Sequence, residues 1–218
     1  MTELVVKAVL GYLLGSIVGS LLVGRLRGGV DIRRLGSGNA GATNALRTQS
    51  KLFAFWVLLI DIGKGWLATG PLAGARIPGI APAHVHWGVW AVAVCGVAVM
   101  LGHIYPLWYG FRGGKGVATL VGTVFGAAPA LLAPMLLVWL LAVILFGFVG
   151  LASILGALAF VVAAGASAVP PRTPMLVFAV LSAALIAFTH RANVARMLAG
   201  TEPRARRLWL LGAGRSRS

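Results

Sequence analysis

Long apolar segments separated by shorter polar ones are the dominant pattern of this chain. Leu4–Val23, Leu52–Leu72 and His86–Trp108 each approach the roughly 20 residues that a membrane-crossing helix needs, and Met175–Thr189 is a shorter candidate. Between the last two of these, Val117–Val169 continues without a charged residue. The pattern predicts an all-α membrane protein with several spanning helices.

The basic residues lie mainly in three regions, and their distribution predicts the number of spans. These regions are residues 25–51, the turn that ends at Lys115, and the tail from Arg191. Cytoplasmic loops carry an excess of Lys and Arg, so we expect all three regions on the cytoplasmic side. An even number of spans must then separate Lys115 from Arg191. The long apolar run would therefore form three short helices, broken within Gly122–Pro129 and Phe146–Gly150. The total is seven transmembrane helices, with the N-terminus periplasmic or extracellular and the C-terminus cytoplasmic.

Composition supports a lipid environment. Of 218 residues, 59% are hydrophobic and 11% charged, whereas soluble domains have about 25% charged residues. Lys and Arg total 19 against four acids, which gives a net charge of +15. Nucleic-acid-binding proteins place their basic residues on a soluble face, but here they lie between apolar segments, so we expect no nucleic acid partner. The first apolar segment lacks an Ala-x-Ala cleavage site, and we interpret it as a retained helix.

Metal chemistry is not indicated by the sequence. The four acidic residues are dispersed, so no carboxylate cluster is available to hold a divalent ion. His84 and His86 are close neighbours but lack an evident third ligand. Cys95 is the single cysteine, and its apolar surroundings indicate a small core residue. We therefore expect no metal and no cofactor.

Two Gly-rich segments resemble nucleotide-binding motifs but lack the required context. Gly36–Gly41 has the spacing G-x-G-x-x-G, yet Asp31–Arg34 precedes it instead of an apolar strand. Gly110–Gly116 resembles a P-loop, yet Tyr109 stands at the first glycine position and Gly116 at the Ser/Thr position. Neither segment predicts a nucleotide site.

The same segments are suited to binding anions. Backbone N–H groups in Gly-rich turns and at helix starts form concave anion sites. Side chains in the three basic regions add polar or charged groups: Ser37, Asn39, Thr43, Asn44, Arg47, Lys115, His190, Asn193 and Arg196. The last three recur every three residues, which places them on one helix face. A single such loop is explained equally well as a tight turn with a positive anchor. Three of them at one membrane face favour a phosphate-binding site.

Asp61 and Lys64 lie inside the second predicted span, where an ionisable group costs about 2.5 to 3.5 kcal/mol. Their spacing of three lets them neutralise each other on one helix, and this structural pairing is the favoured interpretation. The alternative is functional: Lys64 faces a bound anion while Asp61 holds a basic partner.

Motifs in the three basic regions resemble those of the bacterial acyl-phosphate:glycerol-3-phosphate acyltransferases, the PlsY family. The matching segments, in chain order, are Gly36–Asn44 with Arg47, Asp61–Gly65, Gly102–Pro106, Phe111–Thr119, and His190–Arg196 with Gly200 and Glu202. Because these ordered motifs extend from the end of the first helix to the tail, the resemblance is highly specific.

The resemblance implies that residues 1–218 form one integral membrane acyltransferase domain in the bacterial cytoplasmic (inner) membrane, with seven spans and a site that faces the cytoplasm. It implies transfer of a fatty acyl group from acyl phosphate to the 1-hydroxyl of sn-glycerol 3-phosphate. The products would be lysophosphatidate and phosphate, in the first acylation of phospholipid biosynthesis. We expect these two substrates and the lipid bilayer as partners, a monomeric protein, and a separate enzyme that makes acyl phosphate.

Both substrates of this reaction carry phosphate, which suits a site with many cations and N–H donors. We expect catalytic roles for Ser37, Arg47, Lys115 and His190, through phosphate binding and transition-state stabilisation. The residues expected to bind substrate are Gly36, Gly38, Asn39, Thr43, Asn44, Lys64, His103, Gly113, Gly114, Gly116, Asn193, Arg196 and Glu202. The resemblance implies that a substrate phosphate accepts the acceptor proton, and His190 as general base is the alternative.

Three alternatives fit the sequence less well. Acyltransferases that use acyl-CoA or acyl carrier protein rely on a His-x4-Asp dyad, but the residues five positions after the four histidines are Val89, Ala91, Trp108 and Ala195. A transporter of phosphate or a phosphorylated metabolite would use similar anion sites, but often carries internal repeats, and none is evident. A membrane scaffold without enzymatic activity would leave the Gly-rich clusters unexplained.

Overall fold

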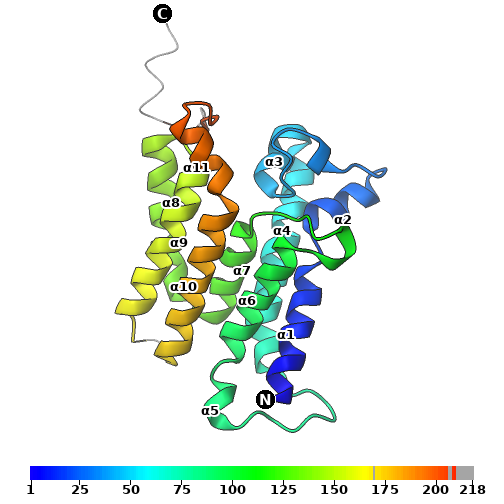
Figure 1. Ribbon diagram of the computed structural model, residues 1–218, viewed down its shortest axis with the longest axis vertical. Coiled ribbons are helices and arrows are strands. Elements are labelled where there is room, and N and C mark those ends of the chain that lie inside the picture. The colour runs from blue at the N-terminus through cyan, green and yellow to red at the C-terminus, as the bar shows by residue number, and fades with distance from the viewer. Residues whose placement is uncertain (169, 206–207, 210–218) are drawn as a thin grey trace, which may run out of the picture.

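The computed structural model describes residues 1–168, 170–205 and 208–209, and every regular element in these ranges is a helix (Figure 1). The elements are α1 (Thr2–Gly15), α2 (Gly19–Leu26), η1 (Ile32–Arg34), α3 (Ala42–Thr48), α4 (Lys51–Leu67), η2 (Ala68–Leu72), α5 (Val85–Gly88), α6 (Ala91–Ile104), η3 (Leu107–Tyr109), α7 (Val117–Ala127), η4 (Pro129–Leu131), α8 (Leu132–Phe146), α9 (Val149–Ala166), α10 (Arg172–Thr189) and α11 (Arg191–Leu198). The long helices lie side by side, with the N-terminus and α5 at one end and α2, α3 and α11 at the other (Figure 1).

Five helical segments in the described ranges are long and apolar enough to cross a bilayer: Lys51–Leu72, Val85–Tyr109, Pro129–Phe146, Val149–Ala166 and Arg172–Thr189. The pair α1 and α2 would be a sixth span, bent by 46°. Helix α7 has 11 residues, which extend about 16 Å against a hydrocarbon core of about 30 Å. The all-α class is confirmed for the described residues, and the count of seven spans stays a prediction.

The predicted first span, Leu4–Val23, consists of two helices in the structure: α1 ends at Gly15 and α2 begins at Gly19. The reason lies on α4. The Lys64 ammonium donates to the carbonyls of Gly15 (2.9 Å) and Ile17 (2.8 Å), and the Gly19 N–H donates to Asp61 Oδ1 (3.0 Å). Where a helix is interrupted inside a membrane, the backbone N–H and C=O groups that lose their helical hydrogen bonds need such partners. The ion pair therefore stabilises a bend that the local sequence alone does not specify.

The long apolar run contains three helices, as predicted. Helix α7 ends at Ala127 and η4 begins at Pro129, and α8 ends at Phe146 before α9 begins at Val149. Both breaks fall within the predicted ranges. At the second break, Gly147 has a positive φ of 76°, a conformation in which a glycine commonly ends a helix.

Small residues bring the helices that carry the site into close contact. A Cβ atom at Gly15 would lie 2.2 Å from the Val99 carbonyl oxygen, and one at Gly102 would lie 2.1 Å from the Tyr12 carbonyl oxygen. Glycines at both positions therefore allow the backbones of α1 and α6 to touch, a packing mode typical of membrane helices.

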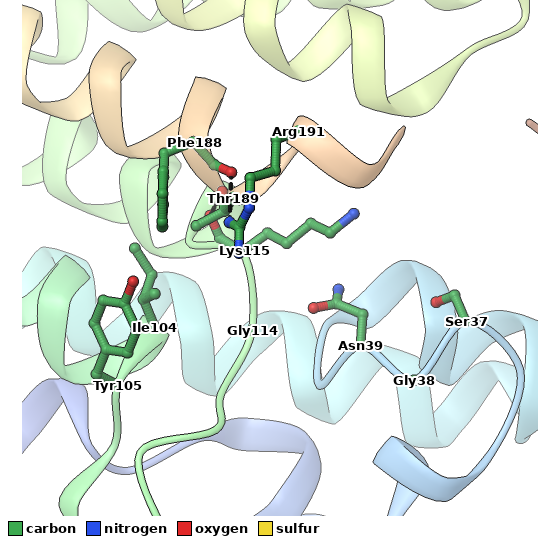
Figure 2. Close-up of a pocket in the computed structure, with 10 residues that line it drawn as sticks. All are labelled: Ser37, Gly38, Asn39, Ile104, Tyr105, Gly114, Lys115, Phe188, Thr189 and Arg191. Atoms are coloured by element: carbon green, nitrogen blue, oxygen red, sulfur yellow. Dashed lines mark hydrogen bonds between the residues drawn. The ribbon is translucent and has the colours of Figure 1, made fainter. Parts of the chain in front are cut away.

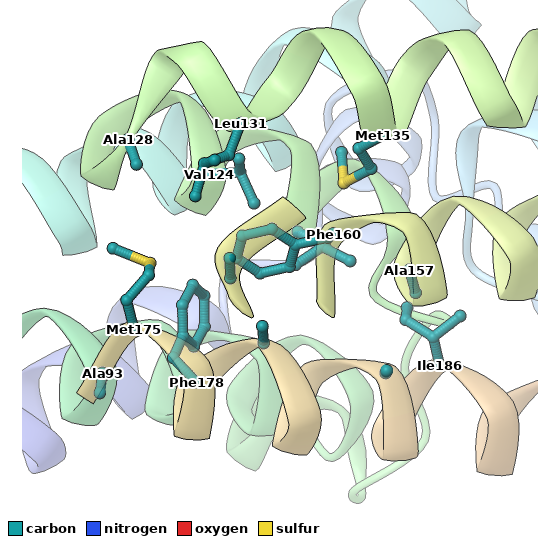
Figure 3. Close-up of a cluster of buried hydrophobic side chains, with 14 of the residues drawn as sticks. Ala93, Val124, Ala128, Leu131, Met135, Ala157, Phe160, Met175, Phe178 and Ile186 are labelled. Carbon is teal, nitrogen blue, oxygen red and sulfur yellow. The ribbon is translucent and has the colours of Figure 1, made fainter. Parts of the chain in front are cut away.

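A second packing region joins α6 and α7 to α8, α9 and α10. Its buried side chains come from α6 to α10, and Phe160 of α9 meets Phe178 of α10 edge to face at 5.7 Å (Figure 3). Ile186 belongs to the same cluster, one turn before the end of α10. This core fixes the end of α10 relative to α6 and α7, where the polar residues of the sequence motifs meet.

Candidate functional site

The first motif folds around one buried amide, Asn44. Its Oδ1 accepts from the Ser37 N–H, and its Nδ2 lies 3.0 Å from the carbonyl oxygens of Ile32, Leu35 and Asn39. Gly36 and Gly38 take positive φ values of 56° and 72° within this loop, a region that glycine enters without steric cost. Asn44 thus shapes the loop that presents Ser37 and Asn39.

Arg33 connects this loop to the second motif. Its guanidinium pairs with Asp31 (2.8 Å) and donates to the carbonyls of Tyr109 and Arg112 (2.9 Å each). The hydrogen bond from Arg33 lowers the pKa of the Asp31 carboxyl below its usual value. Two segments distant in sequence are therefore held together by one side chain.

The second motif forms a loop on the end of α6. The Gly113 N–H donates to the Ile104 carbonyl (3.0 Å) and the Gly114 N–H to the His103 carbonyl (3.1 Å). On the other side, the Thr189 hydroxyl donates to the Lys115 carbonyl (3.1 Å). Gly116, with a φ of 87°, immediately precedes α7. Lys115 is thus held between α6 and α10.

The third motif supplies a polar chain around the Lys115 ammonium. Lys115 Nζ donates to Asn193 Oδ1, and Asn193 Nδ2 donates to Glu202 Oε1 (2.6 Å). Glu202 Oε2 also pairs with Arg196 Nε (2.6 Å). Asn193 and Arg196 share α11 as the spacing predicts, but His190 lies at the junction between α10 and α11. The Glu202 carboxylate neutralises Arg196 and leaves Lys115 without a carboxylate partner among the described residues.

These segments surround a cavity of about 270 Å³ that is open on one side. Figure 2 shows the Ser37–Asn39 loop on one side, the residues at the end of α10 on the other, and Gly114 and Lys115 between them. The lining residues are Ser37, Gly38, Asn39, Ile104, Tyr105, Gly114, Lys115, Phe188, Thr189 and Arg191. The prediction that the three basic regions meet is confirmed by this geometry.

Half of the residues that line the cavity are not among those predicted from the sequence. Ile104, Tyr105, Phe188, Thr189 and Arg191 line the cavity but were not predicted. Each lies within two positions of His103 or His190, so adjacency to a motif histidine was the available signal.

Several predicted residues lie outside the cavity lining. Asn44, Lys64 and His103 are buried, and their polar side-chain atoms contact other protein groups instead of the cavity. Gly36, Thr43 and Arg47 are exposed on the first motif. Gly113 and Gly116 shape the second loop. His190, Asn193, Arg196 and Glu202 belong to the third motif, in which Asn193 contacts Lys115 and Glu202 contacts Asn193 and Arg196.

Burial and neighbouring cations lower two pKa values at the site. The pKa of Lys115 falls to about 8, because the ammonium is buried and because Arg196 and Arg47 oppose its charge, while Glu202 partly compensates. The pKa of His190 falls to about 4, because its imidazole is buried and lies near Lys115. At pH 7, therefore, His190 is neutral and Lys115 is mainly charged. A phosphate placed beside Lys115 would relieve the repulsion among these cations.

Among the described residues, no group of three or more His, Cys, Asp or Glu side chains could hold a metal ion. The carboxylates at the site are engaged with Arg side chains, Asp31 with Arg33 and Glu202 with Arg196. The arrangement supplies cations and hydrogen-bond donors for an anion.

Fold and site together define an all-helical membrane protein with a cavity lined by cations and hydrogen-bond donors at one end of its helix bundle. The family model described as glycerol-3-phosphate acyltransferase matches residues 5–200. The chain belongs to the glycerol-3-phosphate acyltransferase family, which confirms the resemblance seen in its motifs.

Relatives and solved structures agree with this assignment. A glycerol-3-phosphate acyltransferase of Agrobacterium fabrum is 40% identical over 201 residues, which cover 92% of this chain and 91% of the relative. One from Bordetella pertussis is 42% identical over 200 residues, covering 90% and 89%. The crystal structure of PlsY (YgiH), an integral membrane glycerol 3-phosphate acyltransferase in its glycerol 3-phosphate form, superposes with a TM-score of 0.81 at 34% identity, covering 92% of this chain and 94% of that one. Its lysophosphatidic acid form gives a TM-score of 0.79. The chain is thus an integral membrane protein.

The contacts of Arg33 lead to a testable prediction. Replacing Arg33 with Ala removes an ion pair and two hydrogen bonds that join the first and second motifs, so we expect a loss of about 1 to 3 kcal/mol in stability. The matched control is Arg34→Ala, because Arg34 is an exposed neighbour and such a change is expected to cost within about 0.5 kcal/mol. Thermal unfolding in detergent would measure both, and equal melting temperatures would contradict the bridging role of Arg33.

Proposed function

We propose that this protein transfers a fatty acyl group from acyl phosphate to the 1-hydroxyl of glycerol 3-phosphate, giving lysophosphatidate and phosphate. The observation that carries the proposal is the convergence of three motif segments on one cavity with Lys115 and Arg191 in its wall. The cations of Arg47 and Arg196 lie close enough to lower the pKa of Lys115. Such a concentration of positive charge suits two phosphorylated substrates. The relatives named as glycerol-3-phosphate acyltransferases support the choice of acceptor.

Acyl phosphate is the donor that the chemistry favours. Phosphate leaves as a stable anion, so the reaction needs no dedicated acid to protonate the leaving group. The same cations that hold the donor's phosphate can stabilise the negative charge that forms as the C–O bond breaks. The absence of a His-x4-Asp dyad in the sequence supports this donor over acyl-CoA.

In the proposed reaction, the 1-hydroxyl oxygen attacks the acyl carbonyl carbon. A new ester C–O bond forms, the bond to the phosphate oxygen breaks, and the hydroxyl proton must pass to a base. Neutral His190, with a pKa of about 4, is a weak base, whereas the second pKa of a phosphate monoester is about 6. A phosphate group is therefore the better acceptor, and in the proposed reaction the phosphate released from the donor takes the proton and leaves as hydrogen phosphate.

Among the predicted catalytic residues, we assign Lys115, Arg47 and Ser37 to holding the phosphates and stabilising the transition state. His190 contributes a fixed neutral imidazole behind Lys115, with its Nδ1 2.8 Å from the Ile186 carbonyl oxygen. Asn193 holds the Lys115 ammonium. Gly38 and Asn39 of the first motif provide the opposite wall.

We further propose seven membrane traverses in a monomer, with the site facing the cytoplasm of the bacterial inner membrane. Support comes from the alternating direction of successive long helices in Figure 1 and from the basic loops gathered at the end that carries the site. Helix α7 would be the shortest traverse. It packs against α4, α6 and η2, so protein would shield its ends from lipid.

The direct test mixes purified protein in detergent with acyl phosphate and labelled glycerol 3-phosphate. We expect labelled lysophosphatidate from the natural protein. Lys115→Ala should lower the rate by a factor on the order of 100 or more while the protein stays folded, because this change removes a preorganised charge from the transition state. If proteoliposomes instead accumulate the label and no lysophosphatidate forms, the protein is a transporter and the proposal fails.

The low pKa of Lys115 predicts a particular pH dependence. A lysine whose pKa is lowered to about 8 is charged below that pH and loses its proton above it, so kcat/KM for glycerol 3-phosphate should fall about tenfold per unit at higher pH. Lys115→Arg is the matched variant, since arginine stays charged, and any activity it retains should lack this decline. Rates are corrected for spontaneous hydrolysis of acyl phosphate. A flat profile of the natural protein up to pH of about 9.5 would contradict the role of a charged Lys115.

A further inference from the structure

His103 lies in α6 beside the buried ion pair of α4, outside the cavity lining. The residue is 2% exposed, and its Nδ1 lies 2.8 Å from Lys64 Nζ and 3.4 Å from Asp61 Oδ1. Lys64 is itself fixed by Asp61 (3.0 Å) and by the carbonyls at the break between α1 and α2. Contacts on this side therefore hold the Nδ1 edge of the imidazole against the ion pair of α4.

The opposite edge of the imidazole supports the second motif loop. A Cβ atom at Gly114 would lie 2.2 Å from His103 Nε2 and 2.9 Å from Cε1, and the next neighbour would be the Ala40 carbonyl oxygen at 3.3 Å. The two closest atoms both belong to His103. The Gly114 backbone thus rests against the edge of the ring, in a contact that tolerates no side chain.

This contact is adjacent to the charged group of the site. Lys115 follows Gly114 directly, and its carbonyl and ammonium are held by Thr189 and Asn193 on the far side. If the ring were removed, the loop would lose its side-chain support on the α6 side, and it would keep its backbone hydrogen bonds to Ile104 and His103 and the α10 and α11 contacts. The direction of the Lys115 side chain depends on both supports.

We propose that His103 is a positioning residue for the reaction. Its imidazole, held on one edge by Lys64, fixes the position of the Gly114 backbone and thereby that of the Lys115 ammonium. Its ring lies outside the cavity lining. The proposal assigns to His103 a role distinct from the substrate contact expected from its sequence motif, and it rests on the proposed function only for its kinetic readout.

Removing the ring should therefore lower kcat/KM more than it lowers the stability of the fold. We expect His103→Ala to lower kcat/KM for glycerol 3-phosphate on the order of 10- to 100-fold, as a displacement of about 1 Å at a reacting group does. Much of this loss should appear as a raised KM. Gly114→Ala should cause a similar loss, because the new methyl group meets the ring.

The double variant His103→Ala/Gly114→Ala is the decisive measurement. Without the ring, the two closest obstacles to a methyl group on the Gly114 Cα atom are gone, and the methyl group can fill part of the space. We expect the double variant to recover about fivefold or more of kcat/KM relative to Gly114→Ala, a non-additivity that contacting residues show. Losses that simply multiply, or a wild-type KM in His103→Ala, would overturn the proposal.

A matched control lies at the opposite end of the bundle. Lys7 of α1 is also buried, pairs with Glu3 (2.9 Å) and donates to the Ala73 carbonyl (2.7 Å). Lys7→Met should lower the melting temperature and leave KM and kcat unchanged. If it raises KM as His103→Ala does, the effect is one of general stability and the positioning role is wrong.

Hydrogen exchange gives a readout that does not require activity. The amides of Gly113 and Gly114 are bonded to the end of α6, so their exchange, followed by mass spectrometry, should become at least about tenfold faster in His103→Ala and stay unchanged in Lys7→Met. Unchanged exchange in His103→Ala overturns the proposal. A natural protein that forms no lysophosphatidate would refute the proposed function instead, and this exchange measurement would still decide the role of His103.

Discussion

The ion pair between Asp61 and Lys64 is the interaction on which the rest of the structure depends. Both side chains are almost fully buried, 1% and 3% exposed, inside a helix of a membrane protein, where an unpaired charge would cost several kcal/mol. The pair satisfies the carbonyls at the end of α1 and the first N–H of α2. It thereby allows the first membrane segment to bend, and α2 leads directly into the loop that carries the first motif. The same lysine locks His103 beneath the second motif.

The chemistry of the site follows from how charged side chains are paired around the cavity. The two carboxylates near the cavity, Asp31 and Glu202, are each paired with an arginine. Lys115 has an amide partner instead, and its burial lowers its pKa to about 8. Its ammonium is therefore available to an anion at neutral pH. Because His190 is too weak a base to take a proton effectively, a phosphate on the substrate is the natural proton acceptor in the proposed reaction.

Much of this architecture could be predicted from the sequence. The breaks after α7 and α8 followed from Gly and Pro in an apolar run, the pairing of Asp61 with Lys64 from their spacing, and the meeting of three motif regions from the parity of basic loops. The bend near Ser16 could not, because the groups that stabilise it lie on α4, more than 40 residues away. Asn44 was assigned to substrate because its type suits an anion, and only the folded loop shows that its polar atoms serve the backbone. Phe188 was missed because an apolar residue in a span does not reveal which way it faces.

The measurement that tests this account most directly is a double-mutant cycle on the central ion pair. Lys64→Met leaves the Asp61 carboxylate unpaired and Asp61→Asn leaves the Lys64 ammonium unpaired, and breaking a buried pair in this way costs about 3 to 5 kcal/mol. The account predicts that either change lowers both the melting temperature and kcat/KM. The double variant should regain part of this stability, since no charge is stranded although the backbone groups at the bend still lack their partners. It should keep a reduced kcat/KM, because the bend between α1 and α2 and the imidazole of His103 have lost their support. A Lys64→Met protein with the natural melting temperature and the natural kcat/KM would contradict the account.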